Sequence, residues 1–255
     1  MSKSISAQFN KEYGVLPTRS NSVADDEMAL SEHIEEFSQR LIFCLILLTC
    51  FTIACFADVK DIVKLVQAPA DGIKFLQFSP GEYFFASVKI AFFSGILISS
   101  PLILSQVLLY TLPGLTKTER AVILPMTIGS GLLFGVGLWF SYTFLIPAAL
   151  NFFIAYGADV VEPFWSFEQY FNFVAVLIFS TGLAFQVPVI QIVVGLLGII
   201  SGKSMLKSWK YVVVVATILG AVITPSTDPI TQLLLSGALL ALYLSGASFL
   251  IFLDK

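Results

Sequence analysis

Long apolar stretches without charged residues limit how this chain can fold more than any other feature. The run over residues 121–146 contains no Asp, Glu, Lys or Arg. A helix needs roughly 20 apolar residues to cross a hydrocarbon core about 30 Å thick. Only 12% of the whole chain is charged, against about 25% in an ordinary soluble domain. Because so few charges cannot cover a water-facing surface, the sequence predicts an all-α membrane protein.

Six runs are expected to cross the membrane as helices. The second reaches about 45 Å as a helix, so it is expected to tilt, project or bend, with Pro101 as the kink site. The fifth reaches only about 20 Å, which leaves a re-entrant segment as the alternative to a short span. A short span is favoured because the bilayer can thin locally. The six runs are about 41–57, 83–112, 121–146, 171–200, 211–223 and 230–253.

The remaining segments are expected to connect or flank these helices. Residues 1–27 are polar and are predicted to be a disordered tail, and residues 28–255 a single six-helix domain. Glycines in the third run are expected to allow close approach of another helix, namely Gly129, Gly131, Gly135 and Gly137. Residues expected to form loops and kinks are Pro80, Pro101, Pro113, Gly114, Pro188, Pro225 and Asp228.

Lysine and arginine are distributed unevenly over the two sides that six crossings define. Ten of the 14 fall on the side that holds both chain ends, and the other four are Lys60, Lys64, Lys74 and Lys89. The positive-inside rule therefore predicts both termini on the cytoplasmic or stromal side. If the fifth run did not cross, the two ends would lie on opposite sides.

Composition and motifs argue against several classes of function. The net charge of −3 is unsuited to binding nucleic-acid phosphates. The sequence shows no Ser/His/Asp set, Gly-rich phosphate loop or zinc-binding pair, so we expect no enzyme, cofactor or metal. Cys44, Cys50 and Cys55 lie in one apolar run and match no metal-binding spacing, so they are expected to be structural.

Two carboxylates stand at the membrane edge on the side of the chain ends. Glu36 precedes the first run, in a segment expected to form an amphipathic helix at the interface. Its structural alternative is an exposed pair with Arg40. Glu119 precedes the third run, in the first turn expected of its helix, where the helix dipole alone accounts for it. Two carboxylates on one membrane face are nevertheless suited to binding a paired cation.

Gln186 is a polar residue deep in the fourth run. A buried amide needs partners, and the usual one is an interhelical hydrogen bond worth about 1 kcal/mol. A secondary transporter for a small cation, one alternative class of protein, needs polar groups near the membrane midplane, where only Gln186 is expected. A structural subunit that holds other membrane proteins together is a further alternative.

Six motifs resemble, in order, those of the TatC family, the core receptor subunit of the twin-arginine protein translocase. The match extends over about residues 28–252 and includes the number of spans, and the family also has short fifth and sixth helices. Each motif alone is weakly specific, whereas six in register are specific together. They are Glu32-His33-Ile34-Glu35-Glu36-Phe37, Ser79-Pro80-Gly81-Glu82-Tyr83-Phe84, Ser100-Pro101-Leu102-Ile103-Leu104, Pro113-Gly114-Leu115-Thr116-Lys117-Thr118-Glu119-Arg120, Phe185-Gln186-Val187-Pro188 and Thr224-Pro225-Ser226-Thr227-Asp228-Pro229-Ile230-Thr231-Gln232.

The resemblance implies a six-transmembrane-helix, glove-shaped bundle with both termini on the cytoplasmic or stromal side. It also implies that Glu36 and Glu119, with Arg40 and Arg120 nearby, bind the twin arginines of a folded cargo's signal peptide. Guanidinium groups suit such a site because they pair bidentately with carboxylates. The implied partners are TatA- and TatB-like single-span subunits, further copies of the chain and the lipid bilayer, with transport driven by the proton gradient.

Two positions depart from the usual family pattern. Ser38 stands where members usually carry Arg, which leaves Arg40 as the nearby cation. Gln186 stands where many bacterial members carry Glu. With the Pro-Gly-Leu-Thr-Lys and Thr-Pro-Ser-Thr-Asp-Pro motifs, this Gln resembles the cyanobacterial and plastid branch. The resemblance therefore implies a thylakoid membrane, with a bacterial plasma membrane as the alternative.

Overall fold

The computed structural model describes residues 30–70, 72–110, 123–157, 164–223 and 228–252. By its contacts the chain divides into two units, Met1–Ser38 and Gln39–Lys255. The first unit contributes only the start of helix α2 (Leu30–Ala57) to the described residues. The packing that follows lies within the second unit. Several residues singled out by the sequence lie outside the described residues: Pro113, Gly114, Glu119, Arg120, Pro225 and the whole tail 1–27.

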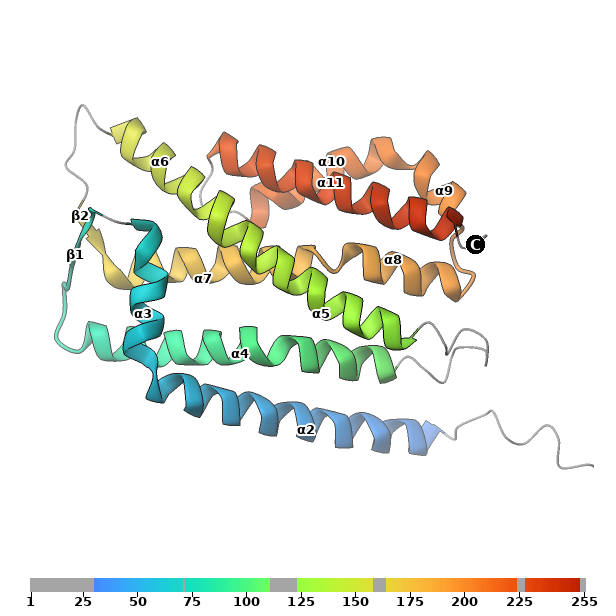
Figure 1. The fold of residues 1–255 in the computed structure, drawn as a ribbon, viewed down its shortest axis with the longest axis horizontal. Helices are drawn as coiled ribbons and strands as arrows, with labels where there is room; N and C mark the ends of the chain where they lie inside the picture. The colour runs from blue at the N-terminus through green and yellow to red at the C-terminus, as the bar shows by residue number, and fades with distance from the viewer. Residues whose placement is uncertain (1–29, 71, 111–122, 158–163, 224–227, 253–255) are drawn as a thin grey trace, which may run out of the picture. The chain divides into compact units, whose positions relative to one another are not determined.

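Helices form almost all of the described part of the second unit (Figure 1). Among the described residues, five helical stretches are long and apolar enough to cross a membrane: Ile34–Ala57, Glu82–Tyr110, Leu124–Tyr156, Phe167–Leu196 and Pro229–Phe252. Helix α10 is a shorter apolar helix. The main helices are α4 (Glu82–Tyr110), α5 (Ile123–Phe140), α6 (Ile146–Gly157), α7 (Phe167–Ala184), α8 (Val187–Leu196), α10 (Trp209–Ile223) and α11 (Pro229–Phe252). The smaller elements are α3 (Val59–Gln67), η1 (Ala68–Ala70), β1 (Lys74–Leu76), the π-helical turn η4 (Ser141–Leu145), β2 (Phe164–Ser166) and α9 (Gly202–Lys207).

The third apolar run continues as helix beyond the predicted span, to Gly157. The helix widens at η4, where the Ile146 N–H bonds to the Ser141 carbonyl five residues back. A proline ring normally presses on the carbonyl four residues before it. The wider π turn immediately before Pro147 relieves this clash, so α5, η4 and α6 follow one another without a break.

The fourth run, predicted as one span, forms two helices. Helix α7 ends at Ala184, and α8 begins at Val187 after a turn formed by Phe185 and Gln186. Ala184 is the residue four positions before Pro188, which lacks the N–H that would bond to its carbonyl. Pro188 therefore accounts for the position of the break.

Pro101 does not interrupt α4, which stays helical on both sides of it. The Leu97 carbonyl, four residues earlier, loses its usual N–H partner to the proline. The hydroxyl of Ser100 donates to this carbonyl instead, at 2.7 Å. A side-chain donor thus satisfies the backbone group that the proline leaves unpaired.

The core of the second unit lies around α7. Leu145 of η4, Leu177 of α7 and Leu235 of α11 are fully buried in one apolar cluster. In Figure 1 the α5–α6 helix crosses α7 obliquely, and α7 also packs against α4. On α2, by contrast, Ile46 and Ile53 are exposed. Apolar side chains on such a helix suit contact with lipid tails, which are as apolar as they are.

Close helix approach occurs at only one of the four glycines expected to allow it. A Cβ built on Gly137 would lie 3.1 Å from the Gly182 Cα, whereas none at Gly129 or Gly135 would meet an atom within 4 Å. At Gly131 the contact is an ordinary 3.5 Å. Among the glycines that the structure describes, the tightest backbone approach is at Gly95, where the Cβ would lie 2.9 Å from both the N and the Cα of Thr52.

Asp228 caps α11. One carboxylate oxygen accepts the Thr231 N–H at 2.8 Å and the other accepts the Thr231 hydroxyl. Pro229 follows as the first helical residue, where its missing N–H is not needed. The loop role expected of Asp228 is therefore that of a buried N-cap.

Candidate functional site

The carboxylates expected to bind arginine are only partly within the described structure. Glu36 lies on α2 within Leu30–Ser38, the described part of the first unit. Glu119 and Arg120 lie outside the described residues. The described residues thus contain one of the two carboxylates, and the arrangement of the pair stays a prediction.

Arg40 has a hydrogen-bond partner that the sequence did not reveal. Its Nη1 donates to Oε1 of Gln106 at 2.8 Å, which joins α2 to α4. The two residues are 66 positions apart, and Gln106 is a lone amide in an apolar run. That isolation was the available signal, since an amide in such a run needs a partner. Arg40 therefore also has a positioning role between the two helices.

Gln186 makes the interhelical hydrogen bonds that a buried amide needs. Its Oε1 accepts the Ser130 hydroxyl at 2.6 Å, and its Nε2 donates to the Ser130 carbonyl at 3.2 Å. Both residues are buried. The amide thus connects the break between α7 and α8 to the middle of α5.

Loss of this pair should lower stability by a small, non-additive amount. Gln186→Leu and Ser130→Ala are each expected to reduce the free energy of unfolding by about 1 kcal/mol. The double variant should lose about 0.5–1 kcal/mol less free energy of unfolding than the two single variants lose together, because the two residues act as one pair. Unfolding in mixed detergent micelles measures these values. Ser180→Ala, at a hydroxyl that bonds only within α7, is the control, and additive losses would contradict the pairing.

A buried carboxylate, Glu82, forms hydrogen bonds at the start of α4. Glu82, only 6% exposed, accepts the backbone N–H groups of Phe78 and Ser79 at 2.6 and 3.2 Å. Its other oxygen accepts the Ser166 hydroxyl at 2.8 Å. Glu82 therefore joins the loop before α4 to β2, which pairs in parallel with β1. In the sequence Glu82 was named only as part of a family motif, and its hydrogen bonds were not predicted.

An ion pair lies at the same end. The Lys89 ammonium of α4 contacts the Glu168 carboxylate of α7, and both side chains are partly exposed. The residues are 79 positions apart. Together with the Glu82 hydrogen bonds, this pair holds the start of α4 against the start of α7.

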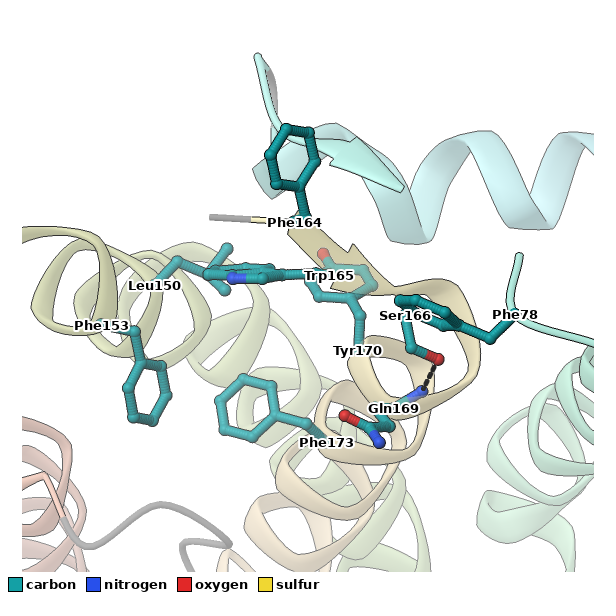
Figure 2. Close-up of a pocket in the computed structure, with 9 residues that line it drawn as sticks. All are labelled: Phe78, Leu150, Phe153, Phe164, Trp165, Ser166, Gln169, Tyr170 and Phe173. Carbon is teal, nitrogen blue, oxygen red and sulfur yellow. Dashed lines mark hydrogen bonds between the residues drawn. The ribbon is translucent and has the colours of Figure 1, made fainter. Parts of the chain in front are cut away.

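An aromatic pocket of about 490 Å³ is formed near β2 (Figure 2). Trp165 of β2 stacks on Tyr170 of α7 with ring centroids 6.3 Å apart. Phe153 of α6 meets Phe173 of α7 edge to face at 6.1 Å. None of the nine described residues that line the pocket is charged. The pocket thus lacks the carboxylates that a pair of arginines requires.

The long apolar helices, with polar side chains joined at their ends and breaks, define an integral, multi-pass helical membrane protein. The family model described as Sec-independent protein translocase protein (TatC) matches residues 32–237. The chain belongs to the TatC family.

Individual relatives agree with this assignment. The chain is 56% identical over 252 residues to the uncharacterized tatC-like protein ycf43 of Guillardia theta, covering 95% of this chain and 87% of the relative. It is 52% identical over 240 residues to the Sec-independent protein translocase protein TatC of Synechocystis sp., covering 94% of each. The crystal structure of the twin arginine translocase receptor TatC in DDM has a TM-score of 0.76 at 30% identity, covering 86% of this chain and 99% of that chain.

Proposed function

We propose that this chain is the TatC subunit of a twin-arginine translocase. In this role it binds the twin-arginine signal peptides of folded cargo proteins and nucleates the translocation complex, with transport driven by the proton gradient. The observation that carries the proposal is the family match over residues 32–237, together with the likeness to a solved twin arginine translocase receptor. As a member of this family the chain is a translocase component and not an enzyme.

The proposed topology has six crossings with both termini on the cytoplasmic or stromal side. Five long apolar helices support it, and the shorter apolar helix α10 is proposed as the sixth crossing. The 15 residues of α10 reach about 22 Å, so the bilayer must thin locally around it. The excess of Lys and Arg on the side of the chain ends favours the same orientation. The glove shape and the single domain over residues 28–255 stay predictions.

The proposed signal-peptide site consists of Glu36 and Glu119, with Arg40 and Arg120 beside them. Six crossings put the segments that carry the two carboxylates on one face of the membrane. Carboxylates suit the cargo because arginine stays charged and pairs bidentately with them. The Arg40–Gln106 hydrogen bond supports a positioning role for Arg40 in the second unit.

The proposed partners follow from membership in a translocase family. They are TatA- and TatB-like single-span membrane subunits, further copies of this chain and the surrounding lipid. Cyanobacterial and chloroplastic relatives point to a thylakoid membrane as the location of this integral membrane protein.

A signal peptide with a photo-crosslinker beside its two arginines tests the proposal. We expect crosslinks to the full chain in membranes to fall at least about tenfold when both arginines are replaced by lysine, because lysine cannot pair bidentately with a carboxylate. Single-span subunits should co-purify with the same chain. Equal crosslinking of the two peptides would contradict the receptor function, and saturable uptake of a small cation by liposomes would favour a transporter.

A further inference from the structure

Three lysines surround a cavity where α9 is followed by α10. Lys203, Lys207 and Lys210 are exposed, and the cavity of about 970 Å³ is also lined by Trp209 and Tyr211. The remaining lining residues are Leu206, Ser208 and Ile251. Helix α9 packs against both α10 and α11, so these residues meet at the start of one apolar helix and the end of another (Figure 1). This set of eight residues is called the basic corner.

The basic corner has a strong positive charge that the described residues do not offset. None of its lysines forms an ion pair with a described residue, and none of its lining residues is a carboxylate. The first turn of α10 contains no acidic residue and carries Lys210. A helix N-terminus is already partly positive, so acidic residues are favoured there and a lysine adds to the unfavourable charge. An anion bound here would be attracted by both sources of charge.

The apolar side chains of the basic corner favour an amphiphile over a free ion. Trp209 and Leu206 are 46% and 39% exposed beside the lysines. Tyr211, 76% exposed, is the next aromatic residue along α10. Tryptophan and tyrosine side chains typically lie at the level of lipid headgroups, where one part of the ring is apolar and the other is wet. A free phosphate would contact the lysines and leave this apolar surface unused.

The shortness of α10 brings lipid headgroups toward the same place. Its 15 residues reach about 22 Å, against a hydrocarbon core of about 30 Å. A bilayer that thins around a short helix moves its headgroups toward the helix end. The lysines at the start of α10 would then lie at phosphate depth.

We propose that the basic corner binds the headgroup of an anionic phospholipid. The phosphate lies among the three lysines, and the glycerol and upper acyl chain lie against Trp209, Leu206 and Ile251. Basic pockets at the cytoplasmic ends of membrane helices bind such headgroups by the same chemistry. The inference rests on the proposed crossing of the membrane by α10.

Native mass spectrometry of the full chain in detergent, titrated with phosphatidylglycerol, tests the proposal. The combined variant Lys203→Gln, Lys207→Gln and Lys210→Gln is expected to bind this lipid about a hundredfold more weakly, at roughly fivefold per lysine. The matched control is Lys60→Gln, Lys64→Gln and Lys74→Gln, which removes the same charge from exposed positions elsewhere. This control should change binding by no more than about twofold. Replacing the three corner lysines by arginine should retain the lipid, because the charge is kept.

Four outcomes would overturn the proposal. Equal loss in the two glutamine variants would show general charge attraction, and unchanged binding in both would exclude the basic corner. Competition by inorganic phosphate at equal concentration would show a site for a free anion. If the chain bound a polyglutamate peptide through these lysines and phosphatidylglycerol did not displace that peptide, the basic corner would be a site for an acidic protein. Signal-peptide crosslinking of the same samples distinguishes a failure of the lipid proposal from a failure of the proposed function. If the chain bound the lipid selectively but did not crosslink to the signal peptide, only the receptor function would be contradicted.

Discussion

Replacing Glu36 or Glu119 by glutamine is expected to lower crosslinking of a twin-arginine signal peptide at least about tenfold for each carboxylate. Glutamine keeps the size of the side chain and removes the charge with which a guanidinium pairs. A hydrogen bond to a charged group contributes about 1.5–3 kcal/mol, and about 1.4 kcal/mol corresponds to a factor of ten in affinity. The measurement is photo-crosslinking in membranes, with insertion of each variant confirmed by resistance to carbonate extraction.

Glu35 supplies the matched control for Glu36. The two residues are neighbours on α2, but successive residues point about 100° apart around a helix. Glu35→Gln removes the same charge and should leave crosslinking within about twofold of the unchanged chain. Equal losses at Glu35 and Glu36 would indicate attraction by general surface charge. Full crosslinking in both Glu36→Gln and Glu119→Gln would refute the proposed site.

Substitution of Gly95 by alanine is expected to reduce the free energy of unfolding by about 2 kcal/mol, the usual scale for overpacking. The new Cβ would lie 2.9 Å from the Thr52 N and Cα. These are backbone atoms of α2, so they cannot rotate aside as a side chain can. Helices α2 and α4 would have to move apart. Because alanine ordinarily stabilises a helix interior by about 1 kcal/mol relative to glycine, even the sign of the effect is informative.

Gly129→Ala is the control for Gly95→Ala. Gly129 lies in the apolar helix α5, and its Cβ would meet no atom within 4 Å. We therefore expect the free energy of unfolding of this variant to equal or slightly exceed that of the unchanged chain, because alanine is preferred over glycine in a helix. Both variants are measured by unfolding in mixed detergent micelles. Equal stability of the two variants would contradict the close approach of α2 and α4 at Gly95.

The ends of the helices show how much of the fold the local sequence pattern could predict. The ends of α2 at Ala57 and of α4 at Tyr110 lie within a few residues of the predicted ends of the first two runs. The continuation of α6 to Gly157 was not predicted, whereas the break after Ala184 lies beside Pro188, which was expected to form a kink within one span. Both features depend on how a proline is accommodated. Pro101 stays inside a helix, whereas Pro188 ends one, because Ser100 supplies a donor for the orphaned carbonyl in the first case.

Contacts at glycines could not be predicted from local pattern. Glycine in an apolar run permits close approach but does not say which helix comes near. The sequence singled out four glycines of α5, and only Gly137 is closely approached, while Gly95 was overlooked. The hydrogen bonds of Glu82 could not be predicted for the same reason, because its partners Phe78 and Ser166 lie on two different segments.

Apolar runs and charge bias were sufficient by themselves to predict a multi-pass helical membrane protein, because crossing a bilayer depends on the length and polarity of single segments. The motifs along those segments were sufficient to indicate the TatC family. Only the tertiary structure decided that Arg40 binds Gln106, that Gln186 binds Ser130 and that the basic corner forms beside the end of α11. These contacts join residues far apart in the chain. They depend on which helix faces which, and no local pattern of residues encodes that.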